Sequence, residues 1–133
     1  MKKILGFVAV TAVMFLSNSV FAEDLTFEVD GTKYEAAKQD LYGFYTWADA
    51  KAGCARLMTE EFNDGWVLPS KEEQKAMYDQ NEQLKGVVVF ANGAYWSSTE
   101  VDEDNASGQN LVNGEPSKGR KSFGARVRCV RII

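Results

Sequence analysis

The stretch Trp66-Val67-Leu68-Pro69-Ser70-Lys71-Glu72-Glu73 connects a short apolar segment to the start of a helix. Ser70 occupies the position expected for a helix N-cap, and Glu73 follows three residues later, which is the spacing of a capping box. The pattern predicts a helix over residues 71–84, ended by Lys85-Gly86.

A second helix is predicted upstream of this stretch. Thr46 resembles an N-cap, and Asp49 stands three residues further on, in a variant of the capping box. One face of the following helix is then apolar and consists of Trp47, Ala50, Cys54, Leu57 and Met58. This periodicity turns Cys54 toward the core.

The segment before both helices has the pattern of a β-hairpin. Leu25, Phe27 and Val29 alternate with polar residues, which is the period of a half-buried strand. Asp30-Gly31 is a hairpin-turn dipeptide, and residues 33–36 are the expected returning strand.

Downstream of the helices, strands are predicted at residues 95–99, 109–112 and 125–133. The segments 102–105 and 113–119 are rich in turn residues. Two helices and several short antiparallel strands predict a single α+β domain in which the helices pack on the strands.

Composition removes several classes of function. The 133 residues include no histidine and two cysteines, and the net charge is −4. Without histidine there is no Ser-His-Asp or Cys-His arrangement and no imidazole zinc ligand. Two cysteines alone cannot form a structural zinc site or hold an iron–sulfur cluster. An acidic chain is repelled by phosphates, so we expect no nucleic-acid partner.

The first 22 residues have the layout of a secretory signal peptide. Met1-Lys2-Lys3 is a basic start, residues 4–16 are an apolar run, and Val20-Phe21-Ala22 resembles a cleavage site. The alternative, a membrane anchor, needs about 20 apolar residues, and this run is shorter. We therefore predict a signal peptide at 1–22, a single domain at 23–133, and export to the periplasm, the cell surface or the medium. The mature chain is not expected to span a membrane.

Export changes how the two cysteines are interpreted. In an oxidising compartment, an even number of cysteines in a small domain is typical of disulfides. Cys54 and Cys129 allow one intramolecular pairing. A reactive thiol or an intermolecular bridge is the alternative.

Three motifs occur in the order of a known family. They are Trp66-Val67-Leu68-Pro69-Ser70, Tyr95-Trp96-Ser97-Ser98-Thr99-Glu100 and Val127-Arg128-Cys129-Val130-Arg131. With them the chain resembles the Lcl C-terminal-domain family, named for the end of a bacterial collagen-like adhesin. The resemblance implies a variant of the C-type-lectin-like fold, which formylglycine-generating enzymes and phage-type variable receptor proteins share.

The resemblance spans about residues 46–131 and has two departures. The family usually has arginine where this chain has Val67, and leucine where Gln74 stands. Any role of that arginine therefore cannot be transferred to this chain. The resemblance also implies a disulfide between Cys54 in the first helix and Cys129 in the last strand.

The sequence offers little for catalysis. Formylglycine-generating relatives oxidise their substrates with two nearby cysteines late in the chain, and this chain has only Cys129 there. Paired carboxylates remain a formal alternative, but the acidic run Glu100, Asp102, Glu103 and Asp104 is typical of a solvated loop. We predict that the protein is not an enzyme.

The oxygen-rich loop at residues 100–105 contains ligand types that suit calcium. The spacing of residues 100–105 fails the EF-hand pattern, with Ala106 at the third ligand position. Glu115-Pro116-Ser117 resembles the sugar-binding Glu-Pro-Asn of calcium-dependent lectins, but the Trp-Asn-Asp that should follow it is missing. We predict no cofactor, with calcium as the alternative.

Aromatic residues could either pack in the core or bind a ligand. The three tryptophans Trp47, Trp66 and Trp96 are expected in the core. Tyr42, Phe44 and Tyr45 form a dense cluster before the first helix. We expect them to pack the incoming loop, with a sugar-stacking platform as the alternative. Arg126 and Arg128 alternate on the last strand, where we expect them to pair with acidic residues.

The remaining candidate for a ligand site is the irregular region 101–121, where C-type-lectin-like folds usually meet their ligands. Its candidate binding residues are Asp102, Asp104, Asn105, Glu115 and Lys118. Alanine at these positions is expected to change stability by less than about 1 kcal/mol and to weaken binding.

The sequence thus predicts an exported, non-enzymatic recognition or adhesion module that binds a protein or glycan. The alternatives are a structural or assembly component of the periplasm or of a surface appendage, and an enzyme of the formylglycine-generating type.

Overall fold

The computed structural model describes residues 25–58, 65–81 and 90–133. In chain order, the helices and strands of these residues are β1 (Thr26–Val29), β2 (Thr32–Ala36), α1 (Trp47–Ala55), α2 (Lys71–Gln80), β3 (Ala94–Glu100), β4 (Asn105–Asn110), β5 (Pro116–Arg120) and β6 (Val130–Ile132). The predicted signal peptide at 1–22 and the predicted end of the second helix at Leu84 lie outside the described residues.

The first sheet is the predicted N-terminal hairpin with the C-terminal strand added to it. Its order is β1-β2-β6, with both pairs antiparallel. Val29 pairs with Thr32 across the turn, so the loop has two residues. Asp30 and Gly31 both have positive φ, 49° and 84°. A type I′ hairpin turn needs this backbone at both positions, which explains the Asp-Gly dipeptide.

The second sheet, of order β3-β4-β5, differs in part from the expectation. Strand β3 confirms the strand predicted at 95–99. Strand β4 ends at Asn110 instead of covering 109–112, and β5 occupies most of the predicted turn segment 113–119. These segments contain no β-branched or aromatic residues, so β4 forms a strand through pairing with β3 and β5 through pairing with β4, and not through local propensity.

The last predicted strand is shorter than expected. Of residues 125–133, only β6 is a regular strand. Ahead of it, Ala125 and Arg126 form isolated bridges to Tyr45 and Tyr95. This stretch therefore threads between two segments instead of extending the first sheet.

The start of α1 confirms the predicted N-cap. Asp49 N donates to Thr46 Oγ1 at 3.3 Å. Trp47, Ala50 and Cys54 are buried as expected. The prediction is wrong for Met58, which is 70% exposed. Because the helix ends at Ala55, its periodicity does not extend to that residue.

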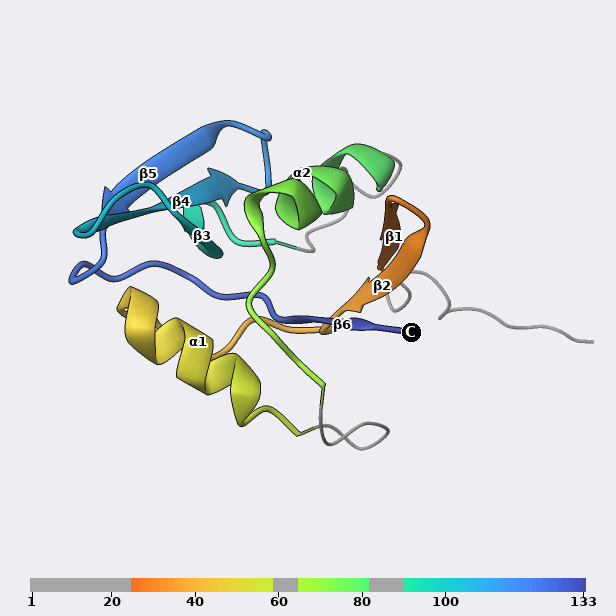
Figure 1. Ribbon diagram of the computed structural model, residues 1–133, viewed down its shortest axis with the longest axis horizontal. Helices are drawn as coiled ribbons and strands as arrows, with labels where there is room; N and C mark the ends of the chain where they lie inside the picture. The colour runs from red at the N-terminus through yellow and green to blue at the C-terminus, as the bar shows by residue number, and fades with distance from the viewer. Residues whose placement is uncertain (1–24, 59–64, 82–89) are drawn as a thin grey trace, which may run out of the picture.

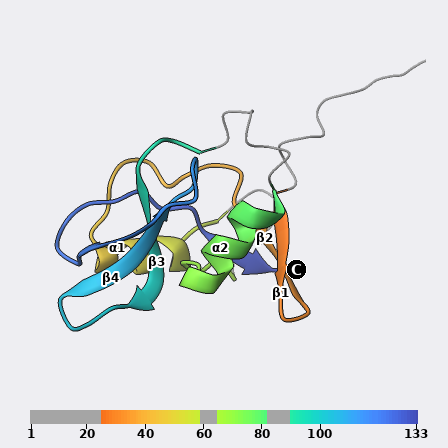
Figure 2. The ribbon, with the colours of Figure 1, turned by 90° about the horizontal axis from the view of Figure 1, so that it is seen from above.

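The start of α2 confirms the capping box. Glu73 N donates to Ser70 Oγ at 3.1 Å, and Ser70 N donates to Glu73 Oε1 at 3.0 Å. The helix buries Gln74 and Met77. It lies between β1 on one side and the second sheet on the other (Figures 1 and 2).

Gln74 connects α2 to the second sheet through its carboxamide. Its Nε2 donates to Tyr95 O at 3.2 Å and to Trp96 O at 2.8 Å. Gln74 is 1% exposed, so its carboxamide N–H groups need acceptors within the protein, and these two carbonyls provide them. A glutamine at the position where the family usually has leucine therefore has a structural reason.

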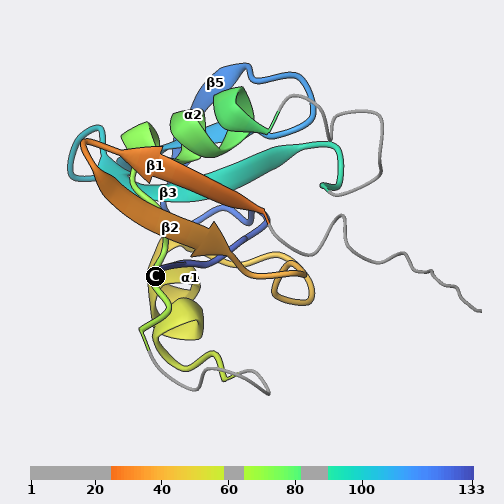
Figure 3. The same cartoon turned by 90° about the vertical axis from the view of Figure 1, so that its right-hand side faces the viewer.

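The predicted disulfide is present. Cys54 of α1 is bonded to Cys129, with the Cα atoms 5.5 Å apart. Figures 1 and 3 show α1 and α2 on opposite sides of the C-terminal segment that carries Cys129. The disulfide lies in a core cluster with the three tryptophans, whose predicted burial is confirmed. The α+β class, two helices, two small antiparallel sheets and one disulfide agree with the expectation.

Candidate functional site

Three of the predicted site residues lie together in the turn between β3 and β4. The Asp102 carboxylate accepts hydrogen bonds from Asp104 N at 2.9 Å, from Asn105 N at 2.8 Å and from Asn105 Nδ2 at 2.9 Å. These donors, the Asp104 amide first, lower the pKa of the Asp102 carboxyl. Asp102 therefore shapes the turn, and its oxygens are largely engaged within it.

The acidic run is also neutralised by neighbouring lysines. Lys121 Nζ forms an ion pair with the Glu100 carboxylate and donates to Glu103 O at 2.9 Å. The hydrogen bond and charge of Lys121 lower the pKa of Glu100. The positive charge of Lys118 adds a smaller lowering to the pKa of Asp102. Much of the acidic character of this turn is therefore balanced within the molecule.

The other two predicted residues lie elsewhere. Glu115 is in the turn between β4 and β5, at the opposite end of the hairpin from Asp102. Strand β4 has six residues, so the two turns are about 20 Å apart. Lys118 lies midway along β5. The structure brings together Asp102, Asp104 and Asn105, and it does not bring Glu115 to them.

Metal ligation has little support in residues 25–58, 65–81 and 90–133. No group of three or more histidine, cysteine, aspartate or glutamate side chains there could hold a metal ion. Both cysteines of the chain are used in the disulfide and are buried.

Aromatic side chains are exposed in the loop before α1 and in the segment after β5. Tyr42 is 96% exposed, Phe44 is 65% exposed and Phe123 is 62% exposed. The expectation that Tyr42 and Phe44 pack the incoming loop is therefore wrong, whereas Tyr45 does pack against the core. We call Arg126 and these three exposed rings, which lie on two segments paired at Tyr45 and Ala125, the aromatic surface.

Backbone pairing holds the two segments of this surface together. Tyr45 N donates to Ala125 O at 2.9 Å, and Ala125 N donates to Tyr45 O at 3.0 Å. Leu41 N donates to Val127 O at 3.0 Å, and Trp96 Nε1 donates to Tyr45 O at 2.7 Å. These bonds fix the backbone on both sides of Tyr42 and Phe44. The two exposed rings are therefore attached to a loop whose ends are held by hydrogen bonds.

Arg126 covers part of the Phe44 ring. Its guanidinium carbon lies 4.6 Å from the ring centroid. Among the described residues, Arg126 makes this cation–π contact and not the predicted ion pair with an acidic residue. Gly124 lies close to the base of the Phe44 side chain, because a Cβ at residue 124 would be 3.1 Å from Phe44 Cβ. A side chain at residue 124 would therefore press on Phe44.

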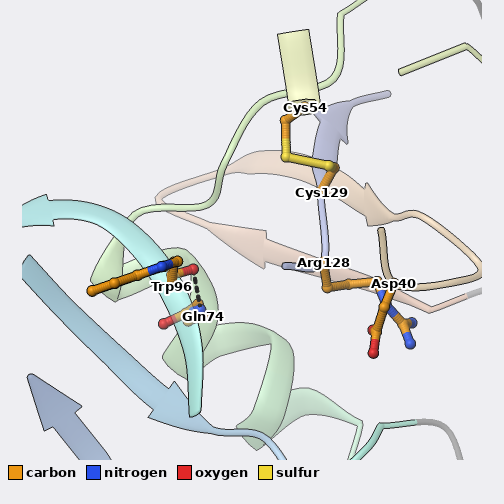
Figure 4. Close-up of a disulfide and its surroundings, with 6 residues drawn as sticks. All are labelled: Asp40, Cys54, Gln74, Trp96, Arg128 and Cys129. Carbon is orange, nitrogen blue, oxygen red and sulfur yellow. Dashed lines mark hydrogen bonds and ion pairs between the residues drawn. A yellow bond between two sulfur atoms is a disulfide. The ribbon is translucent and has the colours of Figure 1, made fainter. Parts of the chain in front are cut away.

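A buried ion pair anchors the same loop from beneath. Arg128 Nε donates to Asp40 Oδ1 at 2.8 Å, as expected for an arginine paired with an acidic residue, and Arg128 Nη1 donates to Ala37 O at 3.1 Å. Tyr95 Oη donates to Asp40 Oδ2 at 2.8 Å. Figure 4 shows Asp40 and Arg128 beside the segment that carries Cys129.

Phe123 had no place in the sequence prediction. It lies in a polar stretch, Lys121-Ser122-Phe123-Gly124, directly after β5. A large aromatic residue isolated among small and charged residues lacks the period of a strand or helix. That isolation is the signal in the sequence that indicates exposure.

In the part of the chain that the structure describes, neither helix is long and apolar enough to cross a membrane. The disulfide is typical of an extracellular or periplasmic domain.

Comparison with curated proteins found no match. The family model of the Lcl C-terminal domain matches residues 22–131. This range includes every helix and strand except the end of β6. The chain therefore belongs to the Lcl C-terminal domain family.

Proposed function

We propose that this protein is an exported, non-enzymatic recognition module that binds a protein or glycan through its aromatic surface. The observation that supports the proposal is the exposure of Tyr42 and Phe44 on a backbone fixed by hydrogen bonds. Large aromatic side chains that are held in water without a packing role are a feature of binding surfaces.

The energetics of recognition favour such a surface. Tyrosine and phenylalanine offer a large contact area and have few rotatable bonds, so little conformational entropy is lost on binding. Rings also stack on the apolar faces of sugars and fill pockets in protein partners. Because the frame is held by the disulfide and the Asp40–Arg128 pair, the surface is largely preorganised.

The turn carrying Asp102 is a weaker candidate for the main site. Its central carboxylate already accepts hydrogen bonds within the turn, and Glu100 is paired with Lys121. A ligand would have to compete with these bonds. Glu115 lies at the far end of the hairpin and could not act with Asp102 on a small ligand.

A catalytic role is not part of the proposal. The oxidising chemistry of the formylglycine-generating type needs reactive thiols, and Cys54 and Cys129 are bonded to each other in the core. The predicted signal peptide and the disulfide support an exported location.

The test compares binding by the wild-type protein and two double variants. Tyr42→Ala/Phe44→Ala removes two rings of the aromatic surface. Met58→Ala/Val112→Ala is the matched control, because it removes two exposed apolar side chains elsewhere. Each protein is applied to a glycan array and to immobilised envelope proteins, and its fold is checked by thermal unfolding.

The proposal expects one class of ligand to bind the wild type and the control equally and the Tyr42→Ala/Phe44→Ala variant at least about tenfold more weakly. Equal binding by all three proteins would overturn it. If alanine at Asp102 and Asp104 abolishes binding instead, the site lies in the β3–β4 turn. Binding of envelope proteins alone would favour the alternative of a structural or assembly component.

A further inference from the structure

The strand edges of the two sheets differ in how many of their outward backbone groups have hydrogen-bond partners. The outer edge of β1 is closed by side chains from the end of α2. Gln80 accepts from Glu28 N and donates to Glu28 O, both at 2.8 Å. Asn81 Nδ2 donates to Thr26 O at 2.9 Å. The backbone groups of this strand are therefore paired on both sides.

Two further edges are closed by backbone. Val67 and Val130 of β6 exchange two hydrogen bonds, of 2.8 and 2.9 Å. On the outer side of β3, Trp96 N donates to Arg126 O at 2.9 Å, and Arg126 N donates to Ala94 O at 3.1 Å. The outer edge of β5 forms a rim of the molecule in Figure 1, and no other strand of the described residues pairs with it.

The hydrogen-bond pattern identifies which groups of β5 face outward. Asn110 N donates to Glu115 O at 2.9 Å, and Lys121 N donates to Asp104 O at 2.8 Å. These bonds lie at the two ends of the β4–β5 ladder. Because bonded and non-bonded pairs alternate in an antiparallel ladder, Lys118 directs its N–H and C=O away from β4.

The same alternation identifies all the backbone groups of β5 that point away from β4. Ser117 and Gly119 bond to β4, whereas Pro116 O, both backbone groups of Lys118 and Arg120 N point outward. Lys118 and Arg120 are exposed, and their side chains lie on the same face of the strand. Neither side chain forms an ion pair with a described residue.

We infer that the outer edge of β5 accepts an extended acidic segment of a partner protein as an added antiparallel strand. Four outward backbone groups provide hydrogen bonds, as in other cases of strand addition. Carboxylates at alternate positions of the segment would face Lys118 and Arg120. The positive charge of this edge, on a chain with a net charge of −4, selects the acidic partner.

A second copy of this chain fits the edge poorly. Antiparallel pairing of two β5 strands about Lys118 would place this lysine opposite its own copy, and like charges in that position are destabilising. Lysine on an edge strand commonly prevents such self-association. The same charge leaves the edge open to a strand of opposite sign.

The test uses the full exported chain and two acetylated synthetic peptides. In one, threonine alternates with glutamate, and in the other, threonine alternates with lysine. Amide hydrogen exchange is followed by NMR with and without each peptide. The acidic peptide is expected to slow exchange at Lys118 and Arg120 by about tenfold or more, and to change Ser117 and Gly119 little, because these amides are already bonded.

Two variants and a matched control complete the design. Lys118→Glu keeps the backbone and is expected to weaken acidic-peptide binding by about tenfold and to improve binding of the lysine peptide. Lys118→Pro removes the outward N–H and is expected to abolish binding of both peptides. Lys38→Glu makes the same charge change in an exposed loop and is expected to bind like the wild type.

The inference is overturned if neither peptide binds, if both bind equally, or if protection appears away from β5. It is also overturned if Lys118→Glu behaves like Lys38→Glu, or if sedimentation shows a dimer of the wild type with protection at Lys118. The Tyr42→Ala/Phe44→Ala variant should keep peptide binding, so this edge and the aromatic surface are tested separately.

Discussion

Asp40 and Arg128 lie 88 residues apart in the chain, and Arg128 Nε donates to Asp40 Oδ1 at 2.8 Å. The Arg128 side chain is 4% exposed and that of Asp40 is 20% exposed. The pair therefore joins the loop before α1 to the segment before β6 in a largely water-free environment. Because that loop carries Tyr42 and Phe44, the pair also fixes the base of the aromatic surface.

Asp40→Ala is expected to destabilise the fold by about 3 kcal/mol, because it leaves the buried charge of Arg128 and the Tyr95 hydroxyl without this acceptor. The change in free energy of unfolding is measured by urea denaturation. Asp79→Ala is the control, since Asp79 pairs with Lys75 on the exposed surface of α2 and should cost about 0.5 kcal/mol. Equal losses in the two variants would contradict the structural importance of the Asp40–Arg128 pair.

The local signals in the sequence predicted the first half of the fold well. Ser70 with Glu73, Thr46 with Asp49, and Asp30-Gly31 each act within a few residues, so their geometry can be read from the chain alone. The second sheet could not be predicted in the same way. Strand β4 consists of Asn-Ala-Ser-Gly-Gln-Asn, and it becomes a strand because β3 and β5 pair with it.

The candidate site was less predictable, for a related reason. Tyr42, Phe44 and Tyr45 have the same character in the sequence, and burial is the ordinary expectation for such a cluster. Their different exposure follows from the pairing of Tyr45 with Ala125, which turns Tyr45 toward the core and leaves Phe44 outside. That pairing joins segments 80 residues apart, and no local pattern encodes it.

The hydrogen bonding of the indole nitrogens predicts that Trp96→Phe and Trp66→Phe lose different amounts of stability. Trp96 Nε1 donates to Tyr45 O at 2.7 Å, whereas the buried Trp66 Nε1 has no hydrogen-bond partner among residues 25–58, 65–81 and 90–133. Trp96→Phe removes the indole donor from the Tyr45 carbonyl, which keeps its hydrogen bond from Ala125 N, so the variant should cost about 0.5–1.5 kcal/mol more than Trp66→Phe. Trp66→Ala should cost about 3–5 kcal/mol, because its ring lies in the core.

Thermal unfolding of the three tryptophan variants provides the measurement. If Trp66→Phe is at least as damaging as Trp96→Phe, the hydrogen-bond argument fails. An unchanged melting temperature of Trp66→Ala would instead indicate an exposed binding role for that ring.

The disulfide gives a third prediction. Cys54 and Cys129 are separated by 75 positions, so the bond closes a long loop and lowers the conformational entropy of the unfolded chain. Replacing both cysteines with alanine should destabilise the protein by about 4 kcal/mol in the chain-entropy model. Reduction of the wild type by dithiothreitol should lower the melting temperature similarly. Thiol labelling of the native exported protein should detect no free cysteine, and labelling at both positions would reject the bond in the cell.

Tyr95 predicts a loss of stability at alkaline pH. Burial, followed by the hydrogen bond to Asp40, raises the pKa of Tyr95 from 10.0 to about 12. The folded-state pKa of Tyr95 lies above its unfolded value. The stability that the protonated Tyr95 contributes is therefore fully present below pH 10 and is lost as the pH rises toward and beyond 12. Tyr95→Phe should therefore be less stable than the wild type at neutral pH, with a shallower decline above pH 10.

The phenolate absorbance of the folded protein provides an independent measurement for this prediction. Tyr95 should ionise in a late step near pH 12, and this step should be missing in Tyr95→Phe. A wild-type titration without a late step would contradict the prediction.

The β3–β4 turn predicts that two neighbouring aspartates differ in their structural importance. Asp102 accepts bonds from the amides of Asp104 and Asn105, whereas Asp104 contributes mainly its backbone. Asp102→Ala should therefore lower the melting temperature more than Asp104→Ala, whereas the sequence alone predicts a change of less than about 1 kcal/mol for each. The pKa of Asp102 is lowered from 3.8 in the folded protein. The ionised Asp102 carboxylate therefore stabilises the fold above pH 3.8, and this contribution is lost as the pH falls through the lower folded-state pKa. The difference between the variants should thus narrow in acid, and equal melting temperatures at neutral pH would show that the carboxylate does not hold the turn.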